Sequence, residues 1–135
     1  MPHNGVKEKL VKEWLHKAEE DFKTAGFLLK CDDCLTNVIA YHAQQAAEKF
    51  LKAFLTANQI MFPKTHDLQR LLELTGTINP QMMQELNDII ILTPYGVEIR
   101  YPGDRPDASQ EEVNKAVEMI LRVRNCVLDA LRNIV

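Results

Sequence analysis

The apolar residues of this chain recur at steps of three or four over most of its length, and this spacing most constrains the fold. Residues 7–30 and residues 110–134 each show the repeat. A period near 3.6 residues puts such side chains on one side of an α-helix. No segment alternates between apolar and polar residues as a half-buried strand would. The pattern therefore predicts an all-α protein.

Start and stop signals divide the chain into about five helices, three long and two short. The first long helix is predicted over residues 7–30, and the second begins at a Thr36 or Asn37 cap and ends near residue 58. The third long helix follows the capping box formed by Ser109 and Glu112. By spacing, we assign Trp14, Phe22 and Phe50 to the core.

The two short helices are predicted between the second and third long helices. Thr65 is expected to cap the first of them, and Gly76 is expected to end it. Asn79 followed by Pro80 is a start signal for the other, which we extend to about Leu92. Short connections favour antiparallel neighbours, so we predict an up-and-down helical bundle forming one domain over residues 7–134.

Composition excludes several classes of protein. The chain has 135 residues and a net charge of −3, so nothing in its overall charge indicates nonspecific binding to nucleic acid. The first ten residues lack the apolar region of a signal peptide, and no apolar run is long enough to span a membrane. We therefore expect a cytoplasmic protein that does not contact membrane.

The cysteines do not indicate a disulfide framework or a metal site. Their number is odd, and Cys31 and Cys34 form a CxxC pair without the second ligand pair of a zinc site or the βαβ context of a redox motif. We interpret "CDDC" as a loop at the end of a helix that happens to carry thiols. No metal and no cofactor is expected.

The second long helix carries the polar residues of greatest interest. On a helical wheel His42, Gln45, Lys49 and Lys52 share one side, opposite Ala43, Ala46, Phe50 and Phe54. This side is either the solvated face of an amphipathic helix or a polar groove able to hold a phosphate or the edge of a nucleobase. Gln44 falls among apolar residues, so we expect it to be buried and hydrogen-bonded.

Two further segments hold candidate ligand residues. The non-periodic stretch "TPYGVEIRYPGDRPDAS" (residues 93–109) carries Arg100, which suits phosphate, and Tyr101, which can stack on a base. Each could equally be structural, with the arginine binding loop carbonyls and the tyrosine packing on the bundle. His66 follows the Thr65 cap, and is either a helix-start residue bonded to local backbone or part of an anion site.

Four segments in order resemble the HEPN family of nucleotide-binding domains. They are "WLHKAEEDFKTAGFLL" (residues 14–29), "YHAQQAAEKFLKAFL" (41–55), "KTHDLQRLL" (64–72) and "IRYPGD" (99–104). The resemblance covers nearly the whole chain. It implies a helical bundle that commonly forms a homodimer. It also implies either binding of nucleotide or of a minimal nucleotidyltransferase encoded nearby, in a toxin–antitoxin type pair, or metal-independent ribonuclease activity.

The ribonuclease members of that family use an arginine followed four to six residues later by a histidine. Here the histidines are His3, His16, His42 and His66, and the first arginine is Arg70, after the last of them. We therefore predict a non-catalytic module, with RNA ranked below nucleotide as its ligand; the alternative is a ribonuclease with a rearranged site. The residues predicted to bind nucleotide or partner are His42, Gln45, Lys49, Lys52, His66, Arg100 and Tyr101.

Overall fold

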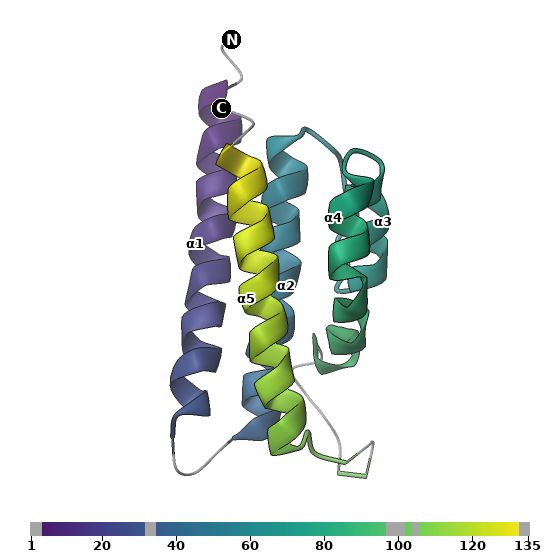
Figure 1. Cartoon of the computed structure of the whole chain (residues 1–135). Helices are drawn as coiled ribbons and strands as arrows, with labels where there is room; N and C mark the ends of the chain where they lie inside the picture. Colours follow the sequence, from purple (N-terminus) through teal and green to yellow (C-terminus); the bar gives the residue numbers. More distant parts are fainter. Residues whose placement is uncertain (1–3, 32–34, 97–101, 104–105, 133–135) are drawn as a thin grey trace.

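Three long helices lie side by side in the computed structural model, and two short helices pack beside them (Figure 1). The structure describes residues 4–31, 35–96, 102–103 and 106–132, and no strand occurs among them. The prediction of an all-α bundle with three long and two short helices is confirmed. The α-helices are α1 (Asn4–Leu29), α2 (Thr36–Ala57), α3 (Leu68–Gly76), α4 (Pro80–Leu86) and α5 (Gln110–Arg132), and a 3-10 helix, η1 (Asn87–Gly96), follows α4.

The second helix, α2, is the centre of the bundle. It contacts α1, α3, α5 and η1, and its alanines let these neighbours approach closely. Phe50, Leu51 and Leu55 are fully buried. A helix covered on so many sides also buries part of its polar face, and this decides the structure of the site. In the described residues, no helix is long and apolar enough to cross a membrane.

Several helix ends are formed by the residues predicted to form them. The side chain of Asn79 accepts a hydrogen bond from the Met82 amide at 3.0 Å, with Pro80 at the first helical position. At the start of α5, Ser109 and Glu112 exchange two backbone–side-chain hydrogen bonds of 3.0 Å. Gly76 is the last residue of α3, as expected.

Two predicted caps are wrong, because the side chains concerned bind elsewhere. Thr36 is the first residue of α2, which has no side-chain cap, and the Asn37 side chain instead accepts from the Ala108 amide at 2.9 Å. That bond holds the segment before α5 against α2. Asp67, rather than Thr65, caps α3, and its carboxylate accepts from the Gln69 amide at 3.0 Å.

The predicted helix from Pro80 to about Leu92 was also wrong in its second half. The α-helix ends at Leu86, and the chain continues as a 3-10 helix to Gly96, so part of the expected loop is helical. Pro94 lies inside η1, where it lacks a backbone donor and disfavours the α conformation at Thr93. The hydroxyl of Thr93 accepts from the Leu68 amide at 3.3 Å, which ties η1 to the start of α3.

Residues 58–67, which we call the α2–α3 connection, leave the end of α2 through a Schellman motif. Gln59 has a positive φ of 59°, and the Ile60 amide donates back to the Leu55 carbonyl at 2.9 Å. None of the ten residues of the connection is fully buried. This segment therefore crosses the surface of the bundle and is held mainly by polar contacts.

The contact between Arg122 and Asp88 makes a testable link between α5 and η1. Both guanidinium nitrogens donate to the carboxylate at 2.8 Å, and these hydrogen bonds hold the pKa of Asp88 below its ordinary value of 3.8. A lowered carboxyl pKa contributes stability above the unfolded-state pKa, and this contribution is lost as the pH falls through the folded-state pKa. We expect Asp88→Asn to lower Tm at pH 7, with the difference from wild type closing on acidification; a difference unchanged at pH 2 would contradict this.

Candidate functional site

Gln44 connects three parts of the chain from a position with no exposed surface. Its Nε2 donates to the His66 carbonyl at 3.0 Å and to Glu48 Oε1 at 3.3 Å, and its Oε1 accepts from Gln45 Nε2 at 2.7 Å. The prediction that Gln44 is buried and hydrogen-bonded is confirmed. Gly96 packs against this amide so closely that an added Cβ would lie 2.7 Å from the Gln44 Cδ. The glutamine thus joins α2, the α2–α3 connection and the end of η1.

A first charged cluster, the Asp21 cluster, lies between α1 and α2. One carboxylate oxygen of Asp21 is 2.8 Å from His42 Nδ1, and the other accepts from Lys49 Nζ at 2.6 Å. Since a carboxylate only accepts, the imidazole must carry its proton on Nδ1. The Asp21 side chain is 11% exposed, whereas those of His42 and Lys49 are 26% and 21% exposed. The imidazole and the ammonium therefore retain access to solvent.

A second cluster, the Glu48 cluster, repeats this connectivity between α2 and the α2–α3 connection. Glu48 Oε1 is 2.8 Å from His66 Nδ1, and Glu48 Oε2 accepts from Lys52 Nζ at 2.9 Å. The Glu48 and Lys52 side chains are only 4% and 8% exposed, whereas that of His66 is 69% exposed. The interpretation of this side of the helix as a solvated face is therefore wrong for Glu48 and Lys52.

Two aromatic rings enclose the Lys52 ammonium group. Its Nζ lies 5.4 Å from the centroid of Trp14 and 5.8 Å from that of Phe62, and these rings meet edge to face at 6.2 Å. The negative face of an aromatic ring attracts a cation, particularly one removed from water. Trp14, which the spacing assigned to the core, is only partly buried and covers this lysine.

The structure brings together five of the seven residues predicted to bind nucleotide or partner. They gather along one side of α2 and the connection beside it: His42, Gln45, Lys49, Lys52 and His66. Gln45 and Lys52 are buried, so the surface is formed by the other three. The remaining two, Arg100 and Tyr101, lie outside the described residues.

Sequence reasoning missed the acidic partners that organise the site. Asp21 lies on α1, 28 residues before Lys49, and no local pattern indicated that they would pair. Glu48 was recognised as an i,i+4 partner of Lys52, but its second contact, to His66, is made across 18 residues. A carboxylate on the inward edge of a helix, such as Asp21, was the available signal for a buried cation partner.

The other reactive side chains are dispersed. Cys31 is exposed just beyond α1, and Cys126 on α5 is partly buried near Glu85, while Cys34 lies outside the described residues. Burial, first, and the Glu85 carboxylate, second, raise the pKa of the Cys126 thiol. Over the described ranges, no group of three or more His, Cys, Asp or Glu residues is arranged to hold a metal ion.

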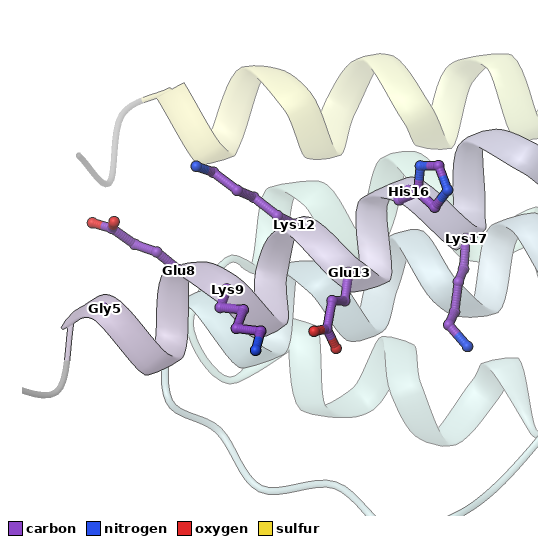
Figure 2. Close-up of a pocket in the computed structure, with 7 residues that line it drawn as sticks. All are labelled: Gly5, Glu8, Lys9, Lys12, Glu13, His16 and Lys17. Atoms are coloured by element: carbon purple, nitrogen blue, oxygen red, sulfur yellow. The ribbon is translucent and has the colours of Figure 1, made fainter.

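A shallow depression on the N-terminal half of α1 does not form a comparable site. It is lined by Gly5, Glu8, Lys9, Lys12, Glu13, His16 and Lys17, all from one helix. Figure 2 shows their side chains spreading to both sides of α1 instead of converging on a point. His16 is 76% exposed and lies 3.8 Å from Glu20 on the same helix. One helix without an opposing wall cannot enclose a ligand.

The bundle and its polar strip define the chain as a small all-helical domain with a buried charged site on its central helix. A profile of the HEPN domain matches residues 11–131. The chain therefore belongs to the HEPN domain family.

Known proteins agree with this assignment. A 62-residue segment is 40% identical to "Putative toxin MJ1304" of Methanocaldococcus jannaschii; this is 46% of the chain but only 40% of the length of that relative. Among solved structures, TT1696 from Thermus thermophilus superposes with a TM-score of 0.71 at 22% identity, covering 89% of this chain and 97% of that one. ST0689, an archaeal HEPN homologue, gives 0.67 at 19% identity, covering 90% and 97%. At these identities, the two structures support the fold alone.

The burial of the Glu48–Lys52 pair generates a stability prediction. Removing one partner of a buried ion pair leaves the other charge without compensation, which costs about 3–5 kcal/mol. We expect Glu48→Ala to reduce the free energy of unfolding by about this amount in urea denaturation. The matched control is Glu73→Ala, which breaks an exposed contact to Arg70 at 3.6 Å, and should cost about 1 kcal/mol or less. Equal losses in the two variants would contradict the prediction.

Proposed function

We propose that this chain is a non-catalytic HEPN module that binds a nucleotide, a partner minimal nucleotidyltransferase or both, through the side of α2 that carries His42, Lys49 and His66. The observation that carries the proposal is the Asp21 cluster. There one buried carboxylate orients an imidazole and an ammonium group that are both partly exposed. A directed cation beside an imidazole donor suits recognition of a phosphate group.

Two features support a module of this kind in preference to the metal-independent ribonucleases of the family. The sequence contains no arginine four to six residues before any histidine. The relative in Methanocaldococcus jannaschii is named as a toxin, which supports a role in a toxin–antitoxin type pair. In such a pair the domain would act as a homodimer with its partner, and the exposed His66 would lie at the edge of the contact surface.

Titration calorimetry against a panel of nucleotides tests the ligand-binding part. We expect Lys49→Ala to weaken binding of a nucleotide about tenfold or more, because a hydrogen bond to a charged group contributes about 1.5–3 kcal/mol. Lys23→Ala, an exposed lysine elsewhere on α1, is the control and should leave affinity unchanged. Arg100→Ala extends the test to the segment before α5. No binding of any nucleotide at millimolar concentration would overturn the nucleotide proposal.

A ribonuclease with a rearranged site is the second candidate, and one observation favours it. In both clusters the carboxylate holds Nδ1, so Nε2 of His42 and of His66 can exchange a proton with a substrate. This is the arrangement by which a carboxylate orients a histidine general base.

Incubation of the purified protein with total RNA separates the two candidates. For the non-catalytic module we expect no cleavage above that of a mock preparation. Cleavage that is lost in His42→Ala or His66→Ala, and retained in His16→Ala, would establish the ribonuclease instead. The His16 control removes an exposed imidazole that belongs to neither cluster.

A further inference from the structure

The α2–α3 connection covers the Glu48 cluster. Its His66 side chain binds Glu48 at 2.8 Å, its His66 carbonyl accepts from Gln44 at 3.0 Å, and its Phe62 ring lies against Lys52. No residue of the connection is fully buried, so few apolar contacts would be lost if it lifted. Segments with few buried contacts and exposed polar ones open at low free energy.

Lys52 cannot reach a ligand in the arrangement described. Its side chain is 8% exposed, its ammonium is bonded to Glu48, and Trp14 and Phe62 flank it. Lys49, three residues earlier on the same helix, is more than twice as exposed and lies beside it on the helix surface. Two lysines one turn apart would bind a phosphate group more tightly than one, yet only Lys49 is accessible here.

We infer that the α2–α3 connection is a strap that regulates this site, with His66 as its latch. In the closed arrangement the strap keeps Lys52 paired with Glu48 and out of solvent. When His66 leaves Glu48 and Phe62 withdraws, water reaches the ion pair and weakens its attraction, and Lys52 turns toward a phosphate held by Lys49. This inference rests on the proposed function, because the strap controls access to the same anion site.

Both ends of the strap have the local structure needed for it to move as a unit. At one end, the Schellman motif at Gln59 and Ile60 closes α2 without any contact to the Glu48 cluster. At the other end, Asp67 caps α3 and Leu68 is fully buried. These two anchors remain in place when the latch between them opens. The latch itself is accessible, since the His66 side chain is 69% exposed.

The experiment compares wild type with His66→Ala, His66→Asn and His16→Ala in the full chain. His66→Ala removes the latch, whereas His66→Asn keeps an amide donor near the position of Nδ1 and so preserves it. AMP and inorganic pyrophosphate serve as probes in titration calorimetry. Trp14 is the single tryptophan of the chain and packs on Phe62, so quenching of its fluorescence by acrylamide reports whether the strap is open.

We expect His66→Ala to bind both probes about three- to tenfold more tightly than wild type, because apparent affinity scales with the fraction of molecules in the competent state. Its Trp14 should be quenched more readily than that of wild type without ligand. His66→Asn and His16→Ala should match wild type in both measurements, and the helical circular dichroism signal of every variant should be retained.

The two ideas fail in different ways. If wild type binds the probes and Lys49→Ala weakens binding, but His66→Ala binds equally or more weakly, the strap is overturned while the proposed function stands. His66 would then be a ligand contact or a bystander. If neither wild type nor His66→Ala binds AMP or pyrophosphate, the nucleotide proposal is overturned, and the strap with it.

Discussion

The carboxylate of Glu48 is the contact on which the polar half of this protein depends. It lies almost out of reach of solvent, and its two oxygens hold Lys52 and His66. Through them α2 is joined to Trp14 on α1 and to Phe62 on the connection. Burying such a pair costs desolvation energy that its attraction barely offsets. The benefit is therefore to arrangement: one carboxylate sets the positions of three separate segments.

The central place of α2 explains why charged residues are buried at all. Small alanines allow neighbours to pack on several of its sides, and the α2–α3 connection crosses the side that remains. Polar residues there must then be satisfied within the protein. Gln44, Gln45, Glu48 and Lys52 satisfy one another and the His66 carbonyl, and among the described residues no buried side-chain N or O atom lacks a partner.

The charges of the site balance in pairs. Asp21 neutralises Lys49 and Glu48 neutralises Lys52, so the two lysines do not form a free cationic patch. A ligand must compete with these carboxylates or wait for one pair to open. The pairs differ in this respect, since Lys49 keeps partial access to solvent and Lys52 has almost none. A HEPN domain built this way is suited to conditional binding, which fits a module regulated by a partner.

The sequence by itself determined the helices, most of their ends and the composition of the polar strip, because these follow from local spacing and from short-range capping by residues such as Asn79 and Ser109. Only the tertiary structure decided which polar residues are buried, since burial depends on segments distant in the chain. Asp21 meets Lys49 across 28 residues and His66 meets Glu48 across 18. A helical wheel cannot show a neighbour that the fold supplies, so Lys52 was predicted to be accessible and is enclosed.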